Sequence, residues 1–244
     1  MPITKKYKNS PLIETICEFQ FIHKDQWDAT IPGMLYEKIK RDYQIKKQRT
    51  DLIALAGIQP DANMSDLTAL TQFYNAKEDA LVQIGKNILT VNCLKPYPHW
   101  EKFKPMILKN FKEYKEISNP VSMRQISFRY INKIDIPYTE GFKVSSFFNF
   151  YPHKPEGIIE KMSTLDATIR IVHNDKRDLL VLRIANLVPE AKEHLSFLLQ
   201  IDFNMNKPEQ LKFEELEKWL EEAHTRINNT FEASVTEECK KLFN

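Results

Sequence analysis

Glycine is scarce in this chain, and its scarcity excludes the common nucleotide-binding loops. The five glycines among 244 residues are Gly33, Gly57, Gly85, Gly141 and Gly157. Neither a Walker loop nor a G-x-G-x-x-G turn can be written, because each needs several glycines within a few residues. Binding of ATP, GTP or NAD by those routes is therefore excluded, and we expect no cofactor.

Cysteine pairs and metal-ligand spacings are lacking as well. The three cysteines, Cys17, Cys93 and Cys239, are odd in number and far apart, so no disulfide framework follows from them. The six histidines are scattered, with no H-E-x-x-H motif and no pair at i,i+4. We therefore expect no metal site.

Long apolar runs are also missing. No run approaches the ~20 residues that a helix needs to cross a bilayer. The opening residues, MPITKKYKNSPLIE, lack the apolar core of a secretory signal. We therefore expect a soluble, cytoplasmic protein that does not bind membranes. Its 42% apolar residues are enough for a sizeable core.

Neither sign of charge dominates the composition. Thirty-five Lys and Arg oppose 33 Asp and Glu, giving a net charge of +2, whereas a dedicated nucleic-acid binder is usually strongly basic. The segment KIKRDYQIKKQR, residues 38–49, is nevertheless locally basic. A solvated face is one interpretation of it, and a phosphate-binding patch is the other. The candidate nucleic-acid residues are Lys38, Lys40, Arg41, Lys46, Lys47 and Arg49.

What the sequence does contain is a regular succession of strand and helix periods. In residues 1–120, a period-2 strand at 13–22 precedes a helix on which Ile31, Leu35 and Ile39 recur at helical spacing. Thr30 and Pro32 are plausible signals for its start. Three short strands, at 52–58, 67–75 and 80–93, and a second helix at 97–117 are expected to follow.

Residues 121–244 repeat this order. They predict a strand at 123–137, a short irregular or helical piece at 140–152, strands at 166–174, 178–187 and 195–205, and one long terminal helix. We therefore expect an α+β protein built from two β-α-βββ-α halves, a pseudo-duplication in which antiparallel sheet packs on the long helices. A single open sheet with helices on one face fits equally well.

One asparagine interrupts the strand FRYINKIDI. Asn132 shares its face with Phe128, Tyr130 and Ile134, while the opposite face carries charged residues. A buried amide needs hydrogen-bond partners, since leaving it without them costs roughly 1–3 kcal/mol. Asn132 therefore either pins a bulge, loop or helix end inside the fold or points into a ligand cavity.

Arginines within the predicted strands also need partners if they are buried. Arg183 shares the odd face of its strand with Leu179 and Val181, which predicts a buried guanidinium in need of an anionic partner. Arg129 and Arg170 also lie in the middle of strands. These arginines either line a common anion site or pair with carboxylates on neighbouring strands.

No catalytic constellation accompanies these residues. A G-x-S-x-G elbow is absent, and no cysteine carries a nucleophile signature. His224 lies beside the apolar stripe of the terminal helix, where a packing role is common. An enzyme of an unfamiliar type, with Tyr130, Asn132, Arg183 and His224 around a cavity, stays open as an alternative.

Several segments together resemble a sporadically distributed prokaryotic family of uncharacterised proteins of about this length. These segments are PLIETICEFQF, WDATIPGMLYEKI, VQIGKNILTVN with the following YPHWEKF, FRYINKIDIP, and WLEEAHTRINNTFEASVTEE. Arg129, Tyr130 and Asn132, together with His224 and Phe231 on the terminal helix, are the most specific marks. The resemblance implies no established activity and no catalytic residues. The patchy occurrence of that family is similar to that of genes in mobile or antiviral defence loci.

These observations favour a non-enzymatic binding or interaction protein, such as a partner subunit, an oligomer or a sensor. The candidate ligand- or partner-binding residues are Arg129, Tyr130, Asn132, Arg170, Arg183 and His224. A nucleic-acid binder that uses residues 38–49 and a sheet face is one alternative, and an enzyme is the other.

Overall fold

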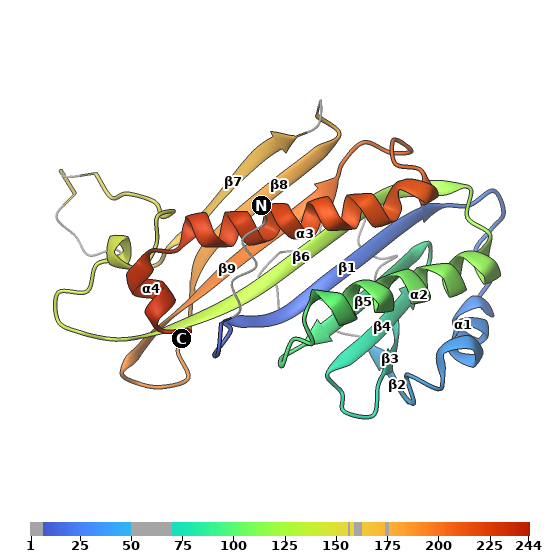
Figure 1. The fold of residues 1–244 in the computed structure, drawn as a ribbon, viewed down its shortest axis with the longest axis horizontal. Coiled ribbons are helices and arrows are strands. Elements are labelled where there is room, and N and C mark those ends of the chain that lie inside the picture. Colours follow the sequence, from blue (N-terminus) through green and yellow to red (C-terminus); the bar gives the residue numbers. More distant parts are fainter. Residues whose placement is uncertain (1–6, 50–69, 156, 159–162, 174–175) are drawn as a thin grey trace. The chain divides into compact units, whose positions relative to one another are not determined.

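The fold was analysed in a computed structural model that describes residues 7–49, 70–155, 157–158, 163–173 and 176–244 (Figure 1). Its strands are β1 (Leu12–Ile22), β2 (Ile45–Arg49), β3 (Leu70–Tyr74), β4 (Ala80–Gly85), β5 (Ile88–Leu94), β6 (Ser122–Pro137), β7 (Asp166–His173), β8 (Asp178–Leu187) and β9 (His194–Met205). Its α-helices are α1 (Ile31–Ile39), α2 (Trp100–Ser118), α3 (Leu216–Ser234) and α4 (Glu237–Lys241).

The strands form a nine-stranded antiparallel sheet, which confirms the α+β class. The strand order is β2-β3-β4-β5-β1-β6-β9-β8-β7. The segment expected as one strand at 80–93 forms two, β4 and β5, which pair antiparallel. A repetition is nevertheless visible in the strand order: β1 neighbours the last strand of the meander β3-β4-β5, and β6 neighbours the last strand of β7-β8-β9. In the second half, the short piece between the first two strands is only a 3-10 turn, η2 (Val144–Ser146).

The chain divides into two compact units that are not sequence halves. Unit 1 comprises residues 1–14, 128–206 and 218–244, and unit 2 comprises residues 15–127 and 207–217. Strands β1 and β6 each contribute residues to both units. The two ends of the chain therefore belong to one unit, together with most of the second half.

In unit 2, local sequence signals define most elements. Pro32 lies in the first turn of α1, where its missing N–H costs nothing. Asn87, with a φ of 61°, makes the turn from β4 to β5 in a conformation that asparagine tolerates. Phe103, Ile107 and the other buried residues of α2 recur at helical spacing, as expected from the sequence.

Strand β2 was not among the expected strands. Its residues pair antiparallel with β3, with Lys46 opposite Phe73 and Lys47 opposite Gln72. Ile45 is its only apolar residue, so the strand carries no period-2 apolar pattern that would reveal it. The strand expected at 52–58 lies outside the described residues, as do the first residues of the one expected at 67–75.

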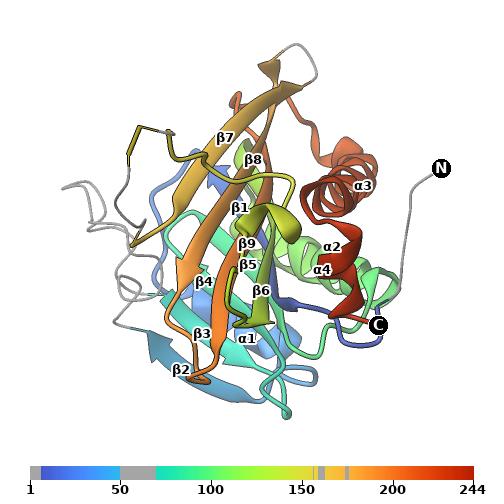
Figure 2. The same cartoon turned by 90° about the vertical axis from the view of Figure 1, so that its left-hand side faces the viewer.

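In unit 1, helix α3 covers one face of the strands (Figures 1 and 2). Trp219 of α3 packs against Phe203 of β9, with ring centroids 5.5 Å apart, and its indole N–H reaches Asp178 of β8. The even residues of β8 and the odd residues of β9 therefore face the helix. The buried apolar residues on the helix-facing side of these two strands are Leu180, Leu182, Ile184, Phe197, Leu199, Ile201, Phe203 and Met205.

The terminal helix ends earlier than the sequence predicts. We expected one helix through residue 243, but α3 ends at Ser234 and a separate short helix, α4, follows. The segment after η2 holds this break: Thr236 N–H donates to Phe147 O (3.0 Å), its hydroxyl donates to Ser146 O (2.7 Å), and Asn149 Nδ2 donates to Ala233 O (3.0 Å). Thr236 also caps α4 by accepting from Cys239 N–H. These tertiary hydrogen bonds replace those of a continuous helix.

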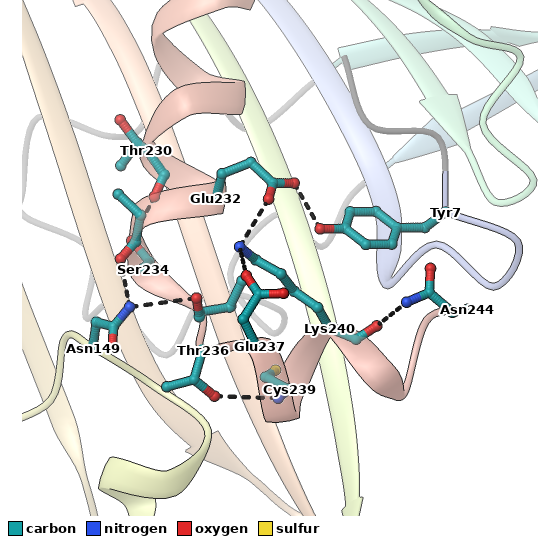
Figure 3. Close-up of polar contacts among 12 residues, drawn as sticks. Tyr7, Asn149, Thr230, Glu232, Ser234, Thr236, Glu237, Cys239, Lys240 and Asn244 are labelled. Carbon is teal, nitrogen blue, oxygen red and sulfur yellow. Dashed lines mark hydrogen bonds and ion pairs between the residues drawn. The ribbon is translucent and has the colours of Figure 1, made fainter. Parts of the chain in front are cut away.

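A polar cluster around Glu232 of α3 binds Tyr7 near the N-terminus and Lys240 of α4 (Figure 3). Tyr7 donates its hydroxyl to Glu232 Oε1 at 2.7 Å, and Lys240 Nζ lies 3.1 Å from Glu232 Oε2. The Tyr7 ring also packs edge-on against Phe231 and Phe243, with ring centroids 6.1 and 5.4 Å away. Burial and the Glu232 hydrogen bond raise the pKa of Tyr7. Tyr7 is thus held against α3 and Phe243 by a hydrogen bond and by apolar contact.

Candidate functional site

Asn132 is buried, as the strand period predicts, and its amide bonds to the backbone. It is 4% exposed, and its Nδ2 donates to the carbonyl oxygen of Leu199 on β9 at 3.0 Å. Leu199 is fully buried. The amide therefore satisfies a main-chain acceptor inside unit 1, and this contact supports the structural alternative for Asn132.

Tyr130 of β6 and His224 of α3 are in contact between the sheet and the helix. The Tyr130 hydroxyl lies 2.8 Å from His224 Nδ1, and Asn228, one turn further along α3, places its Nδ2 3.0 Å from His224 Nε2. Tyr130 is 5% exposed and His224 is 7% exposed. A tyrosine–histidine pair can relay a proton, but general acid–base work needs contact with a substrate. This pair is sequestered between sheet and helix.

Arg183 does not lie on the buried face, so this expectation was wrong. The helix-facing residues of β8 are the even ones, and the odd face that carries Arg183 is partly exposed. Arg183 forms a bidentate ion pair with Asp166 on β7, in which the Nε–Oδ1 distance is 3.0 Å and the Nη2–Oδ2 distance is 2.5 Å. This hydrogen bonding lowers the pKa of Asp166 and raises that of Arg183. The guanidinium therefore has its carboxylate partner on the neighbouring strand.

Arg129 and Arg170 share that outer face. Arg129 forms an ion pair with Asp202 of β9. Asp202 lies opposite Val181, and Val181 lies opposite Arg170, so the four residues cross the strands in one row. Arg170 is exposed on β7.

The candidate residues therefore separate into two groups. Asn132 faces α3, as Tyr130 does two residues before it, whereas Arg183 projects from the opposite face of the sheet. A sheet separates the two side chains, so they do not share the cavity that the sequence interpretation proposed.

Sequence reasoning missed a buried carboxylate. The sequence predicted Asp178 only as the first residue of the strand at 178–187, with no burial assigned to it, yet it is 1% exposed. Its Oδ1 accepts from Trp219 Nε1 at 3.1 Å, and its Oδ2 accepts from Arg177 Nη2 at 2.5 Å. A donor on a distant helix decides this burial, and no local pattern could have revealed it.

The basic segment at 38–49 is largely compensated within unit 2. Lys38 lies 2.8 Å from Glu116, and Lys46 lies 3.9 Å above the ring of Tyr36. Lys40 forms an ion pair with Glu37, and Lys47 forms one with Glu78. Arg41 is exposed, and the side chain of Arg49 lies outside the described residues. Because nearby carboxylates offset several of these charges, less of the positive potential is available to a phosphate backbone.

Strand β7 ends the sheet in unit 1. It pairs with β8 through all eight residues, Asp166 opposite Ala185 to His173 opposite Asp178, and it is the last strand in the order. Three of its side chains are exposed large hydrophobics: Ile169 is 40% exposed, Ile171 42% and Val172 56%. Within the described residues, no strand pairs with its second edge, which carries backbone groups beside apolar side chains.

The rest of the described chain adds no ligand set. Among the residues that the structure describes, no group of three or more His, Cys, Asp or Glu is arranged to hold a metal. No helix within those ranges is long and apolar enough to cross a membrane. A search with protein-family models and a search of curated proteins found no match to this chain.

Proposed function

We propose that this protein is a non-enzymatic interaction protein, a partner subunit or sensor, that binds another protein chain along the open edge of β7. The observation that carries the proposal is the exposure of β7, an eight-residue end strand with apolar side chains in solvent. An open edge is a ready template for strand addition, in which main-chain hydrogen bonds give affinity and side chains give specificity.

The composition of β7 supports this function. Natural proteins usually protect edge strands with lysine, proline or a bulge. The segment DATIRIVH contains neither lysine nor proline, and four of its eight residues are β-branched. Such residues favour an extended backbone and pack well against a neighbouring strand. A partner strand would therefore meet a preformed surface.

The polar candidates fit a structural role better than a catalytic one. The Asn132 amide bonds to the main chain, and the two groups that resemble a proton relay, Tyr130 and His224, bond to each other under α3. Arg129 and Arg183 each have a carboxylate partner. These contacts account for the polar side chains within strands without invoking a substrate.

Capture experiments with an edge-blocked variant test the proposal. In the variant, Ile169→Lys and Ile171→Lys place charges along the apolar side of β7, which opposes strand addition. Val188→Lys is the matched control, because Val188 is 91% exposed just beyond β8. Chains retained by the wild type, including copies of the protein itself, should be lost with the double variant and kept with the control. Identical retention by all three proteins would refute the proposal.

A further inference from the structure

We infer that the strand added to β7 is the β7 of a second copy, running antiparallel and centred on Thr168. This inference rests on the proposed function, and it names the partner. Two copies related by a twofold axis normal to the sheet place residues of the same face opposite one another. The position of the axis then fixes every facing pair along the two strands.

Only the Thr168-centred register makes β7 complementary to itself in charge. It places Asp166 opposite Arg170 of the second copy, and the symmetry creates this pair twice. Thr168 faces its own equivalent, and Ala167 faces Ile169. Opposite-charge pairs and Thr–Thr pairs directly across two strands are both favourable.

The neighbouring registers lack this match. Centring on Arg170 sets two arginines face to face, which is repulsive. Centring on Ile169 leaves Arg170 opposite Thr168 and Asp166 opposite Val172, so neither charge finds a counter-ion. Centring on Ile171 leaves Arg170 opposite Val172.

The surroundings of the two charged residues fit this register. Arg170 is exposed and forms no ion pair with any residue in the described ranges, so its guanidinium can meet a carboxylate of another chain. The Asp166 side chain is 54% exposed while it pairs with Arg183. A carboxylate has about four acceptor positions, so Asp166 can accept from a second guanidinium as well. The dimer would then contain the row Arg183–Asp166–Arg170 at each end of the paired segment.

Register-specific cross-linking tests the inference. The three native cysteines are buried, so a single introduced cysteine supplies the reactive thiol. Under mild oxidation, Thr168→Cys should give a disulfide-linked dimer, because the two positions face each other across the axis. Val172→Cys is the matched control on the same strand. Its two copies would lie about 26 Å apart, eight residues at ~3.3 Å each, and should cross-link several-fold less.

Light scattering on the purified chain supplies the second readout. The wild type should approach twice its mass of 28.8 kDa as its concentration rises. Arg170→Glu sets a carboxylate against Asp166 of the other copy and should weaken the dimer by about tenfold or more, since two ion pairs become two repulsive pairs. Arg124→Glu is the control, because Arg124 is an exposed arginine on β6.

Each of three results would refute the homodimer. The first is a strictly monomeric wild type with no cross-link at position 168. The others are equal cross-linking at positions 168 and 172, and equal dimerisation of the Arg170→Glu and Arg124→Glu variants. If the wild type retains a different protein and the Ile169→Lys, Ile171→Lys variant does not, the homodimer is refuted but the proposed function is supported. If neither dimerisation nor retention of another protein changes in that variant, both proposals are refuted.

Discussion

Replacing Asn132 with alanine should destabilise the fold by about 1–3 kcal/mol. The substitution removes the donor 3.0 Å from the Leu199 carbonyl and leaves that buried acceptor without its side-chain partner. For a chain of 244 residues this corresponds to a fall in Tm of roughly 2–12 °C. Urea unfolding followed by circular dichroism measures the free-energy change directly.

Two further variants make this test specific. Asn204→Ala removes a half-buried asparagine from the outer face of β9, and we expect a change within about 0.5 kcal/mol. Asn132→Asp keeps the shape but turns a carboxylate toward a carbonyl oxygen, so at pH 7 it should destabilise more than alanine does. Acidification should partly relieve this excess, because a protonated carboxyl can donate to the Leu199 carbonyl.

The reasoning about Asn132 would be refuted by a stable alanine variant. If Asn132→Ala unfolds within about 0.5 kcal/mol of the wild type, the amide does not stabilise the strands, and the argument from the buried acceptor fails. If that variant also loses a bound partner or ligand, the side chain contributes to binding.

Four other measurements test the remaining contacts and the burial of the cysteines. Trp219→Phe removes the indole donor from the buried Asp178 and should cost about 1.5–3 kcal/mol in urea unfolding. Tyr7 has a raised pKa in the fold, so its contribution to stability should be fully present below pH ~10 and decline as the pH rises further, and Tyr7→Phe should make Tm less pH-dependent between pH 9 and 11. Arg183→Ala breaks a largely exposed ion pair and should change stability by less than about 1 kcal/mol. All three cysteines are buried, with raised thiol pKa values, so a thiol reagent at pH 8 should modify them only after the chain unfolds.

The two alternative functions make different demands on the molecule. A nucleic-acid binder needs unpaired positive charge, but Lys38 and Lys47 lie beside carboxylates and Lys46 lies over a tyrosine ring. Salt-dependent retention on DNA or RNA would revive that function. An enzyme needs an accessible acid or base, whereas Tyr130 and His224 are both buried. The strand addition proposed for β7 needs neither, since backbone groups would form the hydrogen bonds to the partner.

Where one face of a strand is charged and the other apolar, the sequence alone determined which face is buried. On β6, Arg129, Lys133 and Asp135 occupy one face, so the opposite face with Asn132 had to turn inward. Local signals also located the apolar stripe of α2, from its helical spacing, and the start of α1, from Thr30 and Pro32.

Tertiary structure decided what local patterns leave open. Both faces of β8 are apolar apart from Asp178, Arg183 and Asn186, so its period of two could not show which face α3 covers. Burial of Asp178 depends on an indole that is distant in sequence, and α3 ends at Ser234 because residues 146–149 bond to its last turn and to Thr236. Periodicity tells which residues share a face, whereas only packing against other elements tells which face is covered.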